Sequence, residues 1–175
     1  MKKLLFLGLA LAAMTLTSCG KKDTTGEAKS EEKTEETTPA NFTVSESEKF
    51  SIAYPDIMKE TLNRGNVVNA ASEDGSCRID ATYNDHGPAI SELNKYAENY
   101  PYMIKSLDKD ATIEKANIQG NVLTIKSISE GEVNLHFVVM KEDKIGIAGS
   151  LKCKEDKISE YEKYLKPIMN SIKFK

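Results

Sequence analysis

The sequence has no tryptophan, two histidines and three cysteines among its 175 residues. The lack of tryptophan argues against a large stacking platform for carbohydrate, although seven tyrosines could still form a small one. The sequence also lacks the spaced ligand sets of common metal sites, the glycine-rich loops that bind nucleotides, and the G-x-S-x-G elbow of serine hydrolases. We therefore predict no catalytic residue, no metal and no cofactor, and expect a protein that is not an enzyme.

The sequence also has no excess of positive charge, because it contains 24 lysines and arginines and 27 acidic residues. Nucleic-acid binding requires a clustered positive surface, which this balance does not favour. Removal of an N-terminal signal segment that contains Lys2 and Lys3 would leave 22 basic and 27 acidic residues, a net charge of −5. We expect neither nucleic-acid binding nor attraction to anionic headgroups.

No apolar run in the sequence is long enough to span a bilayer. The N-terminal run, residues 4–16, is uncharged over 13 residues, whereas a membrane-spanning helix needs about 20. Lys2 and Lys3 precede the run and small residues follow it, which is the pattern of a secretory signal peptide. An exported protein meets an oxidising environment, where disulfides persist.

The end of this run, Leu16-Thr17-Ser18-Cys19 followed by Gly20, resembles the lipobox of bacterial lipoproteins. The resemblance implies that residues 1–18 are a signal peptide and that diacylglycerol, with palmitate-type acyl chains, is attached to the Cys19 thiol. An ordinary signal peptide with a chance cysteine is the alternative. The implied location is the bacterial cell envelope, at the outer membrane, on either its periplasmic or its surface face.

Two acyl chains on Cys19 would hold the protein stably, since each buried methylene contributes about 0.8 kcal/mol and one chain alone holds only marginally. Residues 20–40 contain no Val, Ile, Leu, Phe, Tyr or Met. Such a segment cannot bury enough apolar surface to offset its ordering entropy, so we predict a lipidated cysteine and disordered polar linker over residues 19–40. As a flexible coil this linker has a reach of roughly 25 Å.

Periodic patterns begin near residue 41, and we predict a single domain over residues 41–175. Alternating apolar and polar residues predict strands. These strands cover residues 50–54, 67–72, 77–83, 113–118, 122–128, 132–140 and 145–151. Apolar residues three and four apart predict helices over 90–107 and 158–172, the first kinked or broken at Pro101 and the second interrupted by Pro167. A further short helix is predicted after Pro55. This order of elements predicts an α+β fold with an antiparallel sheet of about six to seven strands covered by helices.

Two motifs of this region resemble those of a known family. Phe50-Ser51-Ile52-Ala53-Tyr54-Pro55 resembles the F-x-I-x-Y-P opening of PsbP-like domains, and residues 165–174 resemble their closing helix-to-tail segment. The tryptophan that usually follows the opening motif is absent here. The resemblance covers about residues 42–175. It implies a PsbP-like sandwich of sheet and helices, known mainly from accessory and binding proteins, with no shared catalytic residues.

The two remaining cysteines, Cys77 and Cys153, fall on the apolar positions of their strands, so both are expected to point into the same core. This shared direction is a precondition for a disulfide, which would close a long loop and contribute a few kcal/mol of stability. Two buried free thiols are the equal alternative, because the sequence does not determine the separation of the Cα atoms.

The polar positions of the sheet predict a binding face. It consists of Arg78, Asp80, Thr82, Asn134 and His136. His136 would share an exposed face with Arg78 and Asp80 if their strands are neighbours. Solvent-facing side chains without a ligand are the alternative. The other histidine, His86, lies in a loop before a predicted helix, and no further metal-ligand pattern surrounds it.

A long linker, a compact domain and the lack of a catalytic constellation predict a lipid-anchored envelope protein that serves as a non-enzymatic binding or accessory module. Its expected partners are the membrane, through the lipid on Cys19, and an envelope protein. An envelope hydrolase or a small-ligand receptor, with a site assembled from scattered residues, is the alternative.

Overall fold

The computed structural model describes residues 41–84, 92–142 and 144–175. The predicted signal peptide, Cys19, the linker and His86 lie outside the described residues. Within the described part, no helix has the length and apolar character needed to cross a membrane.

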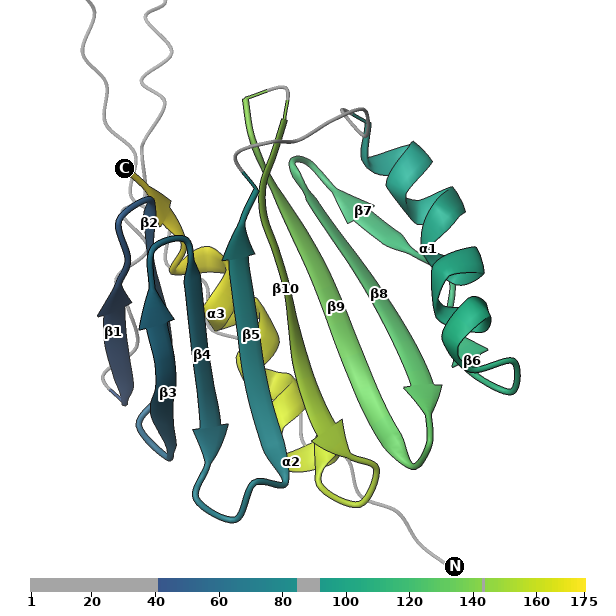
Figure 1. Ribbon diagram of the computed structural model, residues 1–175, viewed down its shortest axis with the longest axis horizontal. Helices are drawn as coiled ribbons and strands as arrows, with labels where there is room; N and C mark the ends of the chain where they lie inside the picture. Colours follow the sequence, from purple (N-terminus) through teal and green to yellow (C-terminus); the bar gives the residue numbers. More distant parts are fainter. Residues whose placement is uncertain (1–40, 85–91, 143) are drawn as a thin grey trace, which may run out of the picture. The chain divides into compact units, whose positions relative to one another are not determined.

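Two antiparallel sheets form the framework of the described domain (Figure 1). The large sheet has eight strands, in the order β3-β4-β5-β10-β9-β8-β6 with β7 pairing to β8, and the small sheet has the order β1-β2-β11. The strands are β1 Phe42–Glu46, β2 Phe50–Pro55, β3 Met58–Arg64, β4 Val67–Ser72, β5 Cys77–Tyr83, β6 Thr112–Ile113, β7 Asn117–Gln119, β8 Val122–Ser129, β9 Glu132–Lys141, β10 Lys144–Lys154 and β11 Lys173–Phe174. The helices are α1 Leu93–Leu107, α2 Ile158–Tyr161, the 3-10 turn η1 Glu162–Tyr164, and α3 Leu165–Asn170.

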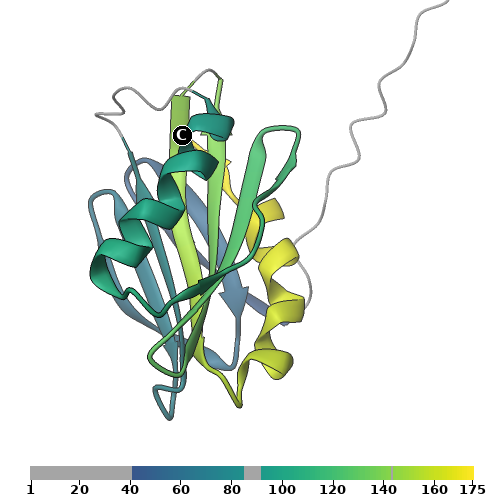
Figure 2. The same ribbon diagram turned by 90° about the vertical axis from the view of Figure 1, so that its right-hand side faces the viewer.

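The helices lie on opposite faces of the large sheet, with α1 on one face and α2 and α3 on the other (Figure 2). The main core lies on the second face, where alternate residues of β5, β9 and β10 pack against β2 and the C-terminal helices. Strand β5 shows the pattern clearly, since Cys77, Ile79 and Ala81 are buried while Arg78 and Thr82 are exposed. The alternation of apolar and polar residues along the strand therefore gives the sheet one buried apolar face and one polar face.

The packing of Phe137 shows how tightly this core is built. Phe137 on β9 is opposite Gly149 on β10 and is fully buried. A Cβ atom at Gly149 would lie 2.4 Å from the Phe137 ring and 2.6 Å from the carbonyl oxygen of Asp80. Only glycine therefore lets the aromatic ring cover β10 at this point.

A second, smaller core forms beneath α1. The inward face of the helix, including Tyr100, packs on residues of β8, β9 and β10. Its buried members are Tyr100, Leu123, Ile125, Val138, Met140 and Ile145. Helix α1 covers only part of this face of the large sheet. The polar side of β4 and β5 on the same face is left uncovered beside the helix (Figure 1).

The α+β class predicted from the sequence is confirmed, but the described residues form eleven strands instead of six or seven. The short helix predicted after Pro55 is wrong, because Met58–Arg64 is strand β3. Of the apolar residues that suggested the helix, Met58 is buried but Ile57 and Leu62 are 54% and 43% exposed. A register shift between Glu60 and Leu62 breaks the alternation, which hides the strand from a period-two pattern.

The two long helical patterns also differ from expectation in detail. Of the kink or break predicted at Pro101, the break does not occur, because α1 continues through this residue. Leu107, the last apolar residue of the predicted helical pattern, is 82% exposed and does not face the sheet. The last helix is interrupted, as predicted, but the interruption is the 3-10 turn η1 before Pro167. Pro167 itself lies in the first turn of α3, where its missing N–H leaves no helical bond unmade.

Candidate binding face

A row of side chains crosses the polar face of the large sheet. Asn69 on β4 pairs with Asp80 on β5, Asp80 with Ser150 on β10, and Ser150 with His136 on β9. Directly opposed residues in antiparallel strands have Cβ atoms about 4.5–5.5 Å apart. The four side chains therefore form a continuous polar line across four strands.

The predicted binding face is brought together only in part. Arg78, Asp80 and Thr82 lie on β5, and Asn134 and His136 lie on β9, but β10 separates the two strands. The condition for a shared face, that β5 and β9 are neighbours, is therefore not met. Strand β10 adds two side chains to the face that the sequence analysis missed. They are Ser150 and Lys152, which alternate with the buried Gly149, Leu151 and Cys153. This alternation is visible in the sequence and could have assigned both side chains to the polar face.

His136 is not a solvent-facing side chain, because two tyrosines of α1 stack on it. Its ring centroid lies 4.6 Å from that of Tyr100 and 5.5 Å from that of Tyr96, whose ring plane is within 6° of parallel. The Tyr96 hydroxyl and His136 Nε2 are 2.7 Å apart and share a hydrogen bond. The prediction of an exposed His136 is corrected: α1 covers it and leaves it half-buried.

Burial sets the charge state of this aromatic cluster. It lowers the pKa of His136 to about 4, because the surroundings disfavour imidazolium. Burial, with a smaller contribution from Tyr100, raises the pKa of Tyr96 to about 12. Burial also raises the pKa of Tyr100, against a smaller opposing effect of the Ser127 hydroxyl. All three rings are therefore uncharged at neutral pH.

Two amide oxygens on this face have no hydrogen-bond partner among the described residues. They are Oδ1 of Asn69 and Oδ1 of Asn134, and both atoms are buried. Asn134 uses its other group, Nδ2, to donate to the Tyr100 hydroxyl at 3.2 Å. A buried acceptor left unpaired costs about 1–3 kcal/mol, so each oxygen lowers the stability of this face unless a donor reaches it.

A small group of paired charges lies next to the row. Arg78 Nε is 3.4 Å from Asp80 and Arg78 Nη1 is 3.8 Å from Glu132, which also pairs with Lys152. Hydrogen bonding from Lys152 is the main cause that lowers the pKa of Glu132. The side chains of Arg78 and Asp80 are 49% and 41% exposed, so water screens their attraction and the pair contributes little to stability.

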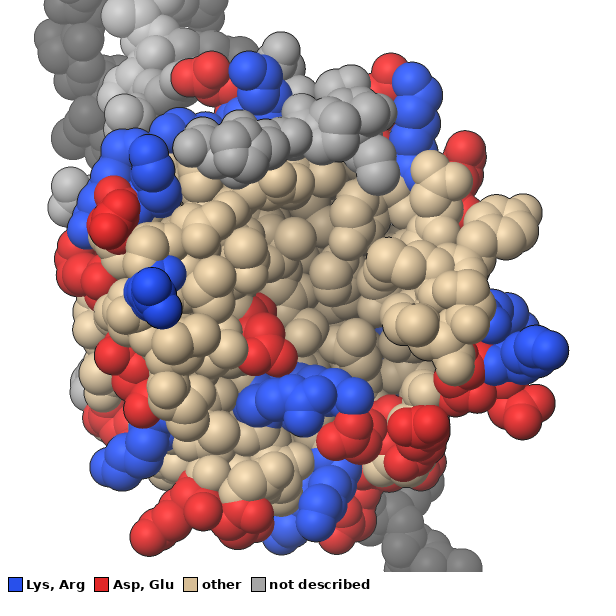
Figure 3. Space-filling model, viewed as in Figure 1, with Lys and Arg blue, Asp and Glu red and all other residues tan. Residues whose placement is uncertain are grey.

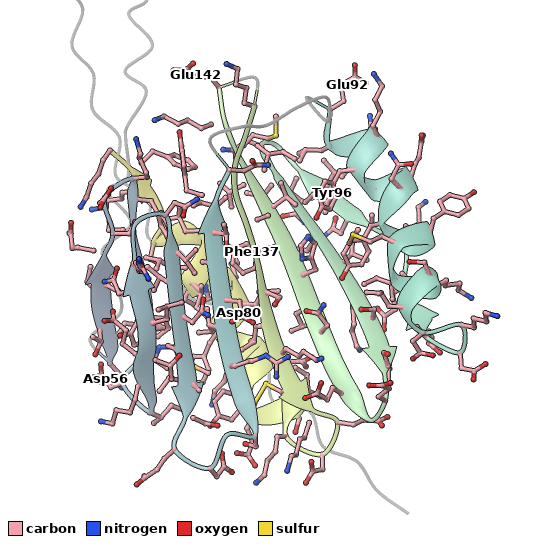
Figure 4. The ribbon with its side chains drawn as sticks, viewed as in Figure 1. Asp56, Asp80, Glu92, Tyr96, Phe137 and Glu142 are labelled. Atoms are coloured by element: carbon pink, nitrogen blue, oxygen red, sulfur yellow. A yellow bond between two sulfur atoms is a disulfide. The ribbon has the colours of Figure 1, made fainter. Side chains whose placement is uncertain are left out.

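The space above the row is hollow. Figure 3 shows a concave area between β5 and α1, formed mainly by uncharged residues, with acidic and basic groups gathered on one side of it. Figure 4 shows Asp80 on β5 and Tyr96 on α1 at two sides of this area. A cavity of about 220 Å³ is lined by Asn134, Lys152 and Glu132 of the sheet together with Ile104 and Asp108. We call the hollow and the row at its floor the concave face.

The concave face is poorly suited to hydrolysis. Ser150 and His136 are neighbours in the row, but His136 Nε2 is engaged by Tyr96 and not by the serine hydroxyl. A histidine with a pKa of about 4 is also a weak base at neutral pH. Across the described residues, no three histidine, cysteine or acidic side chains come close enough together to bind a metal ion.

The two cysteines lie on the opposite face of the same strands. Cys77 on β5 and Cys153 on β10 are direct cross-strand partners with Cα atoms 4.1 Å apart, and the structure joins them in a disulfide. Both are buried in the main core. The bond links the strands that carry Asp80 and Ser150, so it holds the floor of the concave face together.

The comparisons with known proteins identify the fold. No protein-family model matches the chain, and no curated protein matches it. Among solved structures, the solution structure of a cyanobacterial PsbP (CyanoP) from Synechocystis sp. PCC 6803 is similar, with a TM-score of 0.55 and 10% sequence identity. The similarity covers 78% of this chain and 94% of that chain. The described domain therefore has a PsbP-like α+β fold, as its opening and closing motifs indicated.

Proposed function

We propose that this chain is a lipid-anchored protein of the bacterial cell envelope and that its folded domain is a non-enzymatic binding or accessory module. Lipid on Cys19 would hold the chain at the outer membrane, and residues 20–40 would act as a spacer. The concave face would bind the partner. The PsbP-like fold supports the accessory role only by analogy, because similar folds carry unrelated functions.

The lipobox-like segment before Cys19 supports the anchor. Two or more acyl chains on one thiol would give stable attachment without a membrane-spanning helix. A linker with a reach of roughly 25 Å would let the domain sample partners near the membrane surface.

The polar side chains of the concave face, some of which have buried acceptors without a partner among the described residues, support the binding role most directly. Asn69 on β4 and Asn134 on β9 each hold a buried amide oxygen without a partner among the described residues, and strands β5 and β10, which carry Asp80 and Ser150, lie between β4 and β9. A surface that serves only as a cover for the core does not need buried acceptors, and each one reduces stability. A bound molecule with hydrogen-bond donors would compensate this loss.

The anchor is tested by Cys19→Ala, followed by membrane fractionation and mass measurement of the mature protein. We expect the wild type to carry the mass of diacylglycerol on its first residue and to sediment with membranes, and the variant to be released. Unchanged membrane association of the variant would overturn the anchor.

The binding face is tested by placing a photo-crosslinking amino acid at Thr82, which is exposed on β5 beside the row. We expect discrete adducts in whole cells from this position. The matched control is Glu160, which is exposed on α2, on the other side of the sheet. Equal adducts from both positions, or none from Thr82, would count against a partner at the concave face.

The alternative of an envelope hydrolase is weakened by the bond between Tyr96 and His136, which takes the nitrogen a general base would need. The alternative of a small-ligand receptor is favoured by the unpaired amide oxygens, because a hollow with a few fixed polar groups is typical of such sites.

A further inference from the structure

We infer that the groove between α1 and the β6–β7 edge of the large sheet binds an extended peptide segment of a partner protein, which adds to β7 as a further strand. This edge groove shares no residue with the polar row of the concave face, so the inference goes beyond the proposed function and does not depend on it. The open backbone edge of β7, the cavity beside it and the charges at its rim support the inference.

The two edges of the large sheet differ in what lies against them. Strand β3 forms one edge, and β1 covers it through side-chain contacts. Asn63 on β3 donates to the carbonyl oxygen of Glu46 at 3.0 Å, and the Ser45 hydroxyl on β1 donates to Glu60. Strands β6 and β7 form the other edge, where each pairs with β8 and with no second strand of the described residues.

Strand β7 directs backbone groups toward this open side. Residues 120–121 make a two-residue turn, across which Gln119 hydrogen-bonds to Val122. Successive residues of an antiparallel strand direct their N–H and C=O groups alternately to its two sides. Ile118 therefore directs both groups away from β8. A strand edge of this kind is a template for pairing with another chain.

The β6 end of the edge continues the same arrangement. The N–H of Glu114 donates to the carbonyl oxygen of Lys126 on β8 at 2.8 Å, so the preceding Ile113 directs its backbone groups outward. The carboxylate of Glu114 lies 3.0 Å from the Lys126 ammonium, which satisfies this acidic group within the chain. Two outward-facing positions, Ile113 and Ile118, are thus available along one edge.

A cavity of about 950 Å³ lies beside this edge, between α1 and the segment that contains β6 and β7 (Figure 2). Ala97 and Pro101 of α1 line one wall, Ala116 lines the other, and the buried Ile125 of β8 lines the inner side. The small side chains on both walls leave room for a chain between the helix and the strand. Every second side chain of an added strand would enter this apolar space, which is how strand addition gains specificity.

The charges at the rim are balanced. Glu98 and Lys105 lie two turns apart on α1, and Asp110 and Lys115 lie on the opposite wall. Within the described residues none of the four makes an ion pair. Two acidic and two basic groups complement a segment that is neutral or carries both signs. They disfavour a nucleic acid or an anionic lipid headgroup.

The test is NMR of the full-length chain in lipid nanodiscs, titrated with the capped peptide Lys-Val-Thr-Val-Glu. This probe offers alternate valines to the apolar wall and one charge of each sign to the rim. We expect saturable shifts of the backbone amides of Ile113 and Ile118, and slower hydrogen exchange of the Ile118 amide, which would gain a partner. No saturable shift at either amide with millimolar peptide would overturn the inference.

Two methylated forms of the peptide separate backbone pairing from simple burial of the valines. One is methylated on the nitrogens of both valines, and the other on those of threonine and glutamate. Only one of these sets can face β7, so one form should bind at least about tenfold more weakly than the other. Equal affinities of the two forms would overturn strand addition.

A pair of variants makes the same test from the side of the protein. Ile118→Pro removes an outward N–H without breaking a bond to β8 and should lower the affinity for the unmethylated peptide at least about tenfold. Ile118→Val keeps the N–H and should bind like the wild type. Equal binding by both variants, with folding checked by urea denaturation, would overturn the inference, and the methylated peptides decide the matter if Ile118→Pro does not fold.

Discussion

On one face of the eight-stranded sheet, alternate side chains of β5, β9 and β10 are buried by the small sheet and two helices. On the other face, α1 covers β8 and β9 and leaves β4 and β5 open to the hollow. The buried face is apolar and cross-linked by Cys77–Cys153, whereas the open face carries unpaired acceptors and weak ion pairs. The same strands thus supply stability on one side and unused hydrogen-bonding capacity on the other.

The largest effect is expected on the buried face. Phe137→Ala should lower the free energy of unfolding by about 4 kcal/mol, because it removes a fully buried aromatic side chain and leaves a cavity over Gly149. Urea denaturation of the purified protein measures this change. Phe137→Leu, which keeps most of the volume, is the control and should lose clearly less. Equal losses for both substitutions would mean that the ring is not packed as described.

A smaller effect is expected at His136, where α1 packs on the polar face of the large sheet. The pKa of His136 is lowered from its ordinary value near 6.5 to about 4, so the unfolded chain binds the proton more readily than the folded one. Stability is then fully present above pH 6.5 and falls as the pH decreases toward 4. We expect a loss of about 2 kcal/mol across this window, after allowance for partial exposure.

The measurement for His136 is the free energy of unfolding between pH 7 and pH 4, for the wild type and for His136→Phe. The substitution keeps an aromatic ring between Tyr96 and Tyr100 but removes the titrating group, so its slope over this window should be shallower. His86 is present in both proteins, so the comparison isolates the substitution at His136. Parallel curves would show that His136 is not held neutral by α1.

The smallest effect is expected on the open face. Arg78→Ala should change the free energy of unfolding by less than about 0.5 kcal/mol, because its contacts with Asp80 and Glu132 are long and half-exposed. Thermal or urea denaturation at low and at high salt checks this value. A loss above about 1 kcal/mol would show that the charges on this face are structural and not available to a ligand.

Much of the buried face could be predicted from sequence, because alternation reports which side of a strand is apolar. This alternation correctly placed Cys77 and Cys153 in the same core. The α+β class followed from the order in which strand-like and helix-like patterns of apolar residues occur along the chain. The choice between a disulfide and two thiols could not be made, since it depends on β5 pairing with β10, a contact between residues far apart in the chain.

The open face was predicted less well. The five residues chosen do point to one side of the sheet, but sequence alone does not order the strands, so β10 and its Ser150 were left out. Nor could it show that α1 lies over β9, where Tyr96 and Tyr100 enclose His136. Strand β3 was missed because its register shift and its exposed Leu62 resemble a helical spacing.

The proposed function requires the concave face to be a binding surface, and Ser150→Trp tests this directly. The indole would fill the hollow above the row, while the buried face and the disulfide would be untouched. With the photo-crosslinker at Thr82, we predict that Ser150→Trp abolishes the adduct and changes the free energy of unfolding by less than about 1 kcal/mol. An adduct of undiminished yield from a folded Ser150→Trp protein would contradict the account.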